Sequence, residues 1–218
     1  GPPVDLSAGR PGSQGYPVVA AAGDGTLLAA WEETGPADDA LTEIPARRIS
    51  PGGTPDAVVD LPGAPGYPTG EPRLAADRLA GGFLGTLTVA LPDGRTRVML
   101  RYLAPGAATS APWAFPEPAT TPTAGGVPAW LGDGQRFAVA WLATGFGGRD
   151  LKLGFFDAAG IAGQPTVLAA GDIAPYPLSL SVREGALVLA WTEWTDGPGK
   201  ATVRLARFAA AAPVTGLR

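Results

Sequence analysis

The sequence has no cysteine and no histidine among its 218 residues, and it has a single methionine. The absence of cysteine excludes disulfide bridges and a thiol nucleophile. The absence of histidine excludes every catalytic triad built on an imidazole, and together the two absences remove the most common zinc ligands. Much of enzyme chemistry is therefore excluded.

Positive charge is also scarce, because 16 lysines and arginines stand against 20 aspartates and glutamates, for a formal net charge of -4. Such a chain lacks the basic patch that binding to nucleic acid or to anionic lipid needs. No apolar run reaches about 18 residues, so we expect no membrane insertion. No signal peptide is present, but Gly1-Pro2 is typical of the remnant of a cleaved purification tag, so we draw no conclusion about export from the N-terminus.

What the sequence does contain is a repeat. Each copy has a proline, a short apolar strand, a turn that holds an acidic residue and a glycine, and a second apolar strand ending in Ala-Trp; the second copy lacks the acidic residue and the tryptophan. A period near 50 residues predicts supersecondary units that stack in a line or around a ring. The copies start at Pro17, Pro72, Pro128 and Pro177, with spacings of 55, 56 and 49 residues.

Each copy accommodates four short strands, A to D. Asp24-Gly25, Asp133-Gly134 and Glu184-Gly185 predict tight hairpin turns between strands A and B, because glycine supplies the positive φ that such turns need. Strand B is apolar almost throughout, as expected for a strand buried on both faces. Strand C ends in a turn of small residues, and strand D is predicted at 57–61, 113–115 and 166–170.

The repeat is offset at the chain ends, because the chain is predicted to begin with a strand D and to end with a strand C. Val4-Asp5-Leu6 resembles Val59-Asp60-Leu61 in strand D, whereas the last copy has no convincing strand D of its own. We therefore predict an all-β fold, a four-bladed β-propeller in a single domain over 1–218, closed by an N-terminal strand that completes the last blade. The blades are predicted at 17–66, 67–127, 128–176 and 177–212 with 3–8. The alternative, a two-domain β-sandwich, does not explain the offset.

The same order of residues resembles the tandem propeller repeats of large bacterial surface and secreted proteins. The segments that carry the resemblance are 17–31, 48–52, 128–141, 156–160, 177–191 and 207–208. The resemblance implies a propeller fold and an extracytoplasmic location, which would be secreted, periplasmic or on the cell surface. It implies no single activity.

Two patterns invite comparison with sialidases. The Asp-box places tryptophan five residues after aspartate, but Trp31 lies seven residues after Asp24, so we interpret that Asp-Gly as a hairpin turn. Arg48, Arg101 and Arg207 occupy equivalent positions in strand C and could bind an anion together, although strand C side chains usually face solvent or a neighbouring blade.

The recurring tryptophans, Trp31, Trp141 and Trp191, are expected to fill the core between blades, since one large residue repeats at one place. Trp194 occurs once, in a polar loop, and is a better candidate for ligand contact.

The D-to-A connections and the B-to-C loops of a propeller open on one side. There the sequence places aromatic rings beside carboxylates, a mixture that suits sugar binding. The candidate ligand-binding residues are Tyr16, Tyr67, Tyr176, Trp194, Glu193, Asp196, Glu32 and Glu33.

Three functions remain open. The first is a non-catalytic binding module of an exported protein, which recognises a protein partner or a glycan. The second is a glycoside hydrolase or lyase that uses loop carboxylates, namely Glu32, Glu33, Asp38, Asp39 and Glu193. The third is a purely structural ring in a larger surface assembly. We expect no cofactor and predict no metal site. Loop carboxylates together with loop carbonyls could also bind Ca²⁺, although no Asp-x-Asp-x-Asp-Gly spacing is present.

Overall fold

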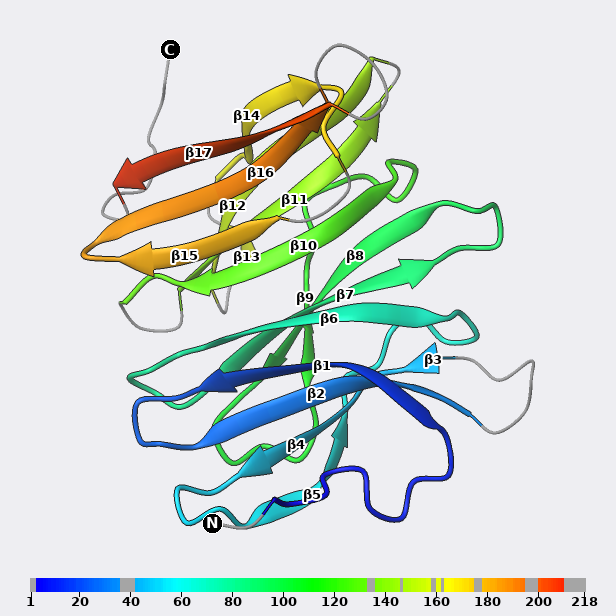
Figure 1. Cartoon of the computed structure of the whole chain (residues 1–218), viewed down its shortest axis with the longest axis vertical. Helices are drawn as coiled ribbons and strands as arrows, with labels where there is room; N and C mark the ends of the chain where they lie inside the picture. The colour runs from blue at the N-terminus through cyan, green and yellow to red at the C-terminus, as the bar shows by residue number, and fades with distance from the viewer. Residues whose placement is uncertain are drawn as a thin grey trace.

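The computed structural model describes residues 3–35, 42–132, 136–145, 147–157, 160–161, 163–174, 178–194 and 200–209. Within these ranges the chain forms strands, turns and bends, and there is no helix with the length and apolar character needed to cross a bilayer. The strands make four antiparallel sheets that follow one another along the sequence and lie one on the next (Figure 1). We number the sheets 1 to 4 in chain order.

Three sheets have four main strands and the last has three. Sheet 1 contains β1 (Ser13–Ala21), β2 (Leu27–Thr34), β4 (Pro45–Ile49) and β5 (Pro55–Asp60), and the short β3 (Thr42–Glu43) pairs with β2. Sheet 2 contains β6 (Thr69–Ala76), β7 (Phe83–Ala90), β8 (Thr96–Leu103) and β9 (Ala111–Trp113). Sheet 3 contains β10 (Thr123–Trp130), β11 (Phe137–Gly145), β12 (Gly148–Asp157), the short β13 (Gly160–Ile161) and β14 (Thr166–Gly171). Sheet 4 contains β15 (Ser179–Arg183), β16 (Ala186–Trp194) and β17 (Ala201–Ala209).

The predicted hairpins between the first two strands of a sheet are confirmed in sheets 1 and 4. Gly25 and Gly185 have φ values of 85° and 69°, in the left-handed region that a tight hairpin turn requires. Asp24 accepts a hydrogen bond of 2.8 Å from the backbone N–H of Thr26 and so stabilises its turn. The corresponding Asp133-Gly134 lies outside the described residues.

The first strand of each sheet is its inner strand, and the four inner strands lie side by side in the order β1, β6, β10, β15 (Figure 1). Three of them carry a β-bulge at the same place, with register shifts between Gly15 and Val18, between Gly70 and Arg73, and between Ala124 and Val127. The bulge holds a residue with positive φ in each case, namely Tyr16, Glu71 and Gly125.

These bulges correct the alignment of the repeat. Pro17 and Pro72 occupy the second bulge position, but Gly126 and not Pro128 occupies it in sheet 3. The proline-based alignment is therefore wrong by two residues in the third copy. Proline was an unreliable marker because a bulge leaves its residues unpaired, so proline is tolerated there without being required.

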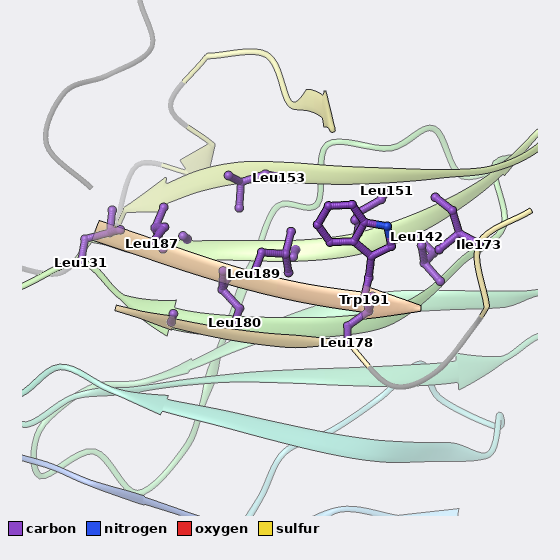
Figure 2. Close-up of a cluster of buried hydrophobic side chains, with 13 residues drawn as sticks. Leu131, Leu142, Leu151, Leu153, Ile173, Leu178, Leu180, Leu187, Leu189 and Trp191 are labelled. Carbon is purple, nitrogen blue, oxygen red and sulfur yellow. The ribbon is translucent and has the colours of Figure 1, made fainter. Parts of the chain in front are cut away.

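Each sheet packs face to face on the next. Successive side chains of the second strand point alternately to the two faces of its sheet, so they show which neighbouring sheet each face contacts. We call the face turned to the preceding sheet the leading face and the other the trailing face. Leu28 and Ala30 on the trailing face of sheet 1 pack with Phe83 and Leu87 on the leading face of sheet 2. The same relation joins sheets 2 and 3 and then sheets 3 and 4, where Leu142 and Leu151 pack with Leu187, Leu189 and Trp191 (Figure 2).

Trp141 and Trp191 have the packing role between sheets that the sequence predicts, since they lie on leading faces with exposures of 0% and 8%. Trp31 does not fill such a space, because it lies on the leading face of sheet 1, which no described sheet precedes. Sheets 2 and 3 are covered on both faces. A pair of two-sheet sandwiches leaves each sheet with one outer face, so this stack is not a β-sandwich.

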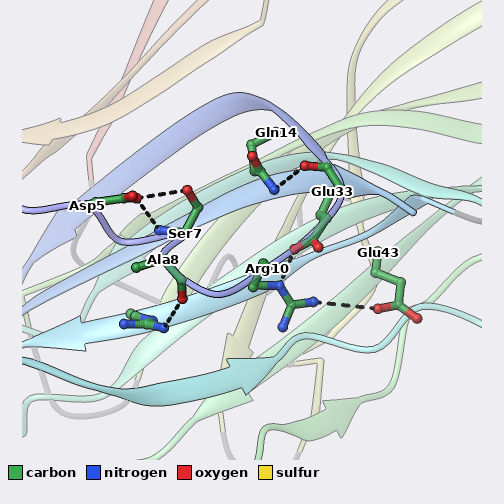
Figure 3. A network of polar contacts seen from close by, with 9 residues as sticks. Asp5, Ser7, Ala8, Arg10, Gln14, Glu33 and Glu43 are labelled. Carbon is green, nitrogen blue, oxygen red and sulfur yellow. Dashed lines mark hydrogen bonds and ion pairs between the residues drawn. The ribbon is translucent and has the colours of Figure 1, made fainter. Parts of the chain in front are cut away.

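The predicted closure by an N-terminal strand is not confirmed. Residues 3–12 form no strand with β17, which among the described residues pairs only with β16. They lie instead across the leading face of sheet 1, where Arg10 forms an ion pair with Glu33 and the carbonyl of Ala8 accepts a hydrogen bond of 3.5 Å from Arg47 (Figure 3).

Two local features explain why residues 3–12 do not form the predicted strand. Asp5 accepts hydrogen bonds from the backbone and the hydroxyl of Ser7, so the segment turns where a strand was predicted. Gly9 follows with a φ of 83°.

Candidate functional site

A groove of about 410 Å³ runs along the inner strands. The later halves of β1, β6, β10 and β15 line it, mostly with small and aliphatic side chains, and Arg78 and Ser181 supply polar groups. No carboxylate lines this groove in the part of the chain that is described.

A second cavity, of about 240 Å³, lies on the side of the sheets where β6 begins. We call it the Tyr67 pocket. The connection from β5 to β6 contributes Tyr67, the last residue of β5 contributes Asp60, and the short strand β3 contributes Glu43. Ile44 and Leu61 line it as well, and each is only 1% exposed.

The connection from β5 to β6, which is a D-to-A connection, lies in this pocket beside residues 42–44, which follow strand B (β2). The propeller topology predicts that these two parts of the chain lie on the same side. It offers an aromatic ring, two carboxylates and the hydroxyl-bearing residues Thr42 and Thr69. Thr69 donates a hydrogen bond of 3.4 Å to the carbonyl of Tyr67, and the N–H of Tyr67 donates to the carbonyl of Ala64 at 3.2 Å. These bonds hold the backbone on either side of the tyrosine.

The other predicted tyrosines are not in this pocket. Tyr16 sits in the bulge of β1, is 72% exposed and lines no cavity described here. Tyr176 and Asp196 lie outside the described residues.

Glu32 and Glu33 have structural roles. Glu32 Oε1 accepts a hydrogen bond of 2.6 Å from the backbone N–H of Glu71, which ties sheet 1 to the bulge of β6. Glu33 is 6% exposed and is held by its ion pair with Arg10. Neither carboxylate lines the Tyr67 pocket.

Glu193 is likewise engaged. It accepts hydrogen bonds of 2.9 Å from the indole of Trp191 and of 2.9 Å from Arg204. The bond from Trp191 and then that from Arg204 hold the pKa of Glu193 below its ordinary value. Trp194, at the end of β16, is 41% exposed and belongs to sheet 4, apart from the Tyr67 pocket.

The three arginines of strand C do not converge. Arg48 donates to the carbonyls of Ala107, at 2.7 Å, and Ala104, and Arg101 donates to the carbonyls of the β5–β6 connection. Burial lowers the pKa of both guanidinium groups. Arg207 lies on the exposed strand β17, so these residues form no common anion site.

The sequence analysis missed Glu43, Asp60 and Glu71. Asp60 stands in Val59-Asp60-Leu61, a segment recognised as part of strand D, but nothing local indicated that it borders a cavity. Glu43 reaches the pocket because β3 pairs with the end of β2, a contact that depends on the sheet.

Hydrogen bonds lower the pKa of several described carboxyl groups. Wherever a carboxyl pKa departs from its ordinary value, hydrogen bonds lower it, as in Asp5, Asp24, Asp93 and Glu193. A general acid needs a raised pKa instead. No group of three or more potential metal ligands occurs among the described residues.

No protein-family model matches the chain, and no curated protein matches it in sequence. Solved structures do resemble it in fold. An α-L-arabinanase of Penicillium chrysogenum, complexed with arabinobiose, is 16% identical with a TM-score of 0.59, over 89% of this chain and 62% of that one. An α-L-arabinofuranosidase of Fusarium graminearum is 14% identical with a TM-score of 0.58, over 88% and 62%. A Hadza microbial sialidase, Hz136, is 14% identical with a TM-score of 0.55, over 87% and 43%.

These structures are β-propellers, and the four sheets described above are arranged as their blades are. The chain spans less than two thirds of the length of each of the three. At this level of identity the likeness establishes the fold alone.

Proposed function

We propose that this protein is a non-catalytic carbohydrate-binding module and that the Tyr67 pocket holds a sugar residue. The observation that carries the proposal is the combination, in one cavity of about 240 Å³, of Tyr67 with Glu43 and Asp60. A sugar ring stacks its C–H face on an aromatic ring and donates its hydroxyls to carboxylates. Pockets for drug-sized ligands are about 300–1,000 Å³, so a smaller one suits a single sugar residue at the end of a glycan.

The pocket's groups are free to bind. Glu43 is exposed over 67% of its side chain, and its one ion pair within the described part of the chain is a long contact of 3.9 Å with Arg10. Asp60 is also exposed. The similar solved structures carry the names of carbohydrate-active enzymes, which is consistent with a glycan ligand. An extracytoplasmic location, as expected from the sequence, would bring the pocket into contact with such glycans.

The contacts that the candidate carboxylates make favour binding without hydrolysis. Hydrolysis needs one carboxyl group that keeps its proton and a second that acts as base or nucleophile. Hydrogen bonds hold the pKa of Glu193 below its ordinary value, which favours its charged form. Glu32 and Glu33 are engaged in contacts within the fold, with the backbone of Glu71 and with Arg10, and Asp38 and Asp39 lie outside the described residues.

The test is a glycan array followed by calorimetry on the best ligand. We expect Tyr67→Ala to weaken binding at least tenfold, about 1.4 kcal/mol. Tyr16→Ala is the matched control, because Tyr16 also precedes a proline but lies outside the pocket, and it should bind as the wild type does. Wild-type affinity in Tyr67→Ala would overturn the site. Release of free sugar by the wild type, abolished in Glu43→Gln, would overturn the non-catalytic role.

A further inference from the structure

The trailing face of sheet 4 is uncovered, in contrast to the same face of the other sheets. Leu28, Leu84 and Ala138 occupy one repeat position on the trailing faces of sheets 1 to 3, and each is 0% exposed because the next sheet covers it. Val188 occupies that position in sheet 4 and is half-buried. No described residue takes the place of a fifth sheet.

This face has an apolar centre. Register pairs Ala190 with Leu205 and Thr192 with Val203, so these side chains lie together on the trailing face. Val203 and Leu205 are 75% and 68% exposed. Two large aliphatic side chains exposed side by side on one face of β17, the edge strand of sheet 4, are typical of an interaction surface.

The ends of the face differ in chemistry. Arg207 pairs with Val188 at one end, and Trp194 pairs with Ala201 at the other. A second such face, turned by a two-fold axis that runs between the faces and across the strands, would place the arginine end of one copy over the tryptophan end of the other. Arginine and tryptophan attract one another by a cation–π interaction, whereas the parallel arrangement would bring like charges together.

The opposite end of the stack is closed to a partner. Trp31, on the leading face of sheet 1, is only 5% exposed, and residues 3–12 lie across that face through Arg10 and Ala8 (Figure 3). A head-to-tail contact, in which sheet 4 of one copy covers sheet 1 of the next, would have to displace this segment. A symmetric contact between two sheet 4 faces displaces nothing.

We propose that the trailing face of sheet 4 binds the same face of a second copy of this chain, and that the two copies form a two-fold dimer. The two sheets pack face to face, as the sheets within each copy do, with Val203 and Leu205 at the centre. The contact removes from water an apolar face that would otherwise favour uncontrolled association. This proposal is independent of the Tyr67 pocket, which lies in sheet 1 and in its connection to sheet 2.

The first test is the mass of the chain in solution by light scattering at about 100 µM, a concentration at which a dimer of micromolar affinity is mostly formed. We expect twice the chain mass of 22.0 kDa. Val203→Lys should give the monomer mass, or at least a tenfold weaker dimer, because it places charge at the contact. Val167→Lys is the matched control, since Val167 is a valine on β14 in sheet 3 with 52% exposure, and it should remain dimeric.

A second measurement does not depend on a disruptive change. The chain has no cysteine, so Leu205→Cys introduces a single thiol. A short bis-maleimide should link two copies of Leu205→Cys and should not link Val167→Cys. A monomeric wild type, a Val203→Lys variant that stays dimeric with a native circular dichroism spectrum, or a mass that includes a different polypeptide would each overturn the proposal.

Discussion

Glu32 in sheet 1 accepts a hydrogen bond of 2.6 Å through Oε1 from the backbone N–H of Glu71, the bulged residue of sheet 2. The same oxygen lies 3.0 Å from where a β-carbon on Gly70 would stand, so the carboxylate is packed against the bulge. A residue that sequence patterns suggested as a ligand-binding or catalytic carboxylate thus joins two sheets.

Replacing Glu32 by alanine should therefore lower stability and leave ligand binding unchanged. Hydrogen bonds to charged groups contribute about 1.5–3 kcal/mol, and we expect a loss of about 2 kcal/mol in the free energy of unfolding, measured by urea titration. Glu32→Gln keeps an acceptor oxygen and should retain more than half of that energy. Equal losses in both variants would show that the charge and not the hydrogen bond is what matters.

Glu71→Gly should raise stability. Glu71 has a φ of 55°, which costs energy for a residue with a β-carbon, and Gly125 already occupies the same bulge position in sheet 3. The change also removes Oε2, which is buried without a hydrogen-bond partner. We expect a gain of about 1 kcal/mol, seen as a higher melting temperature. A lower melting temperature would mean that the Glu71 side chain has a partner beyond the described residues.

Glu117→Ala should be strongly destabilising. Glu117 accepts hydrogen bonds of 3.2 Å from the indole of Trp141 and of 2.8 Å from Lys152, whose side chain is 19% exposed. Loss of the carboxylate leaves a mostly buried ammonium group unpaired, at a cost of about 3 kcal/mol. The double variant Glu117→Ala with Lys152→Met should recover part of this loss, and a double-mutant cycle in denaturant measures the coupling. Additive effects would contradict the pairing.

Acid should weaken the stabilising contribution of Glu193. Its pKa in the folded protein is below the ordinary value of 4.5, chiefly because of the hydrogen bond from Trp191. The stabilisation is therefore fully present above pH 4.5 and is lost as the pH falls through the lowered pKa of the folded state. Melting temperatures of the wild type and of Glu193→Gln, measured from pH 7 down to pH 3, should differ at neutral pH and converge on acidification. A constant difference would contradict this account.

Most of the local structure could be predicted, because its causes are local. The strand D predictions at 57–61 and 166–170 correspond to β5 and β14, whereas the prediction at 113–115 overlaps β9 only at Trp113. The alignment in the third copy was two residues out because Gly125-Gly126 forms the same bulge without a proline.

The candidate site was predictable only in part. Tyr67 was among the proposed residues and does line a pocket, whereas Glu32, Glu33 and Glu193 are committed to Glu71, Arg10, Trp191 and Arg204. No periodicity distinguishes a free loop carboxylate from one that holds two sheets together. Glu71, Arg10 and Arg204 each lie in a different strand or segment from the carboxylate that they contact, whereas Trp191 lies two residues from Glu193 on β16.

The amino-acid sequence by itself determined that this chain forms a repeated series of antiparallel hairpins, with apolar strands, turns of an acidic residue and glycine, and two tryptophans, Trp141 and Trp191, that fill the space between sheets. Only the tertiary structure decided where the N-terminal segment, residues 3–12, lies. Residues 3–12 cover sheet 1 and do not pair with β17, because Arg10 and Glu33, which are 23 residues apart, meet on one face. Such a contact depends on where whole sheets lie, and the alternation within a single strand carries no information about it.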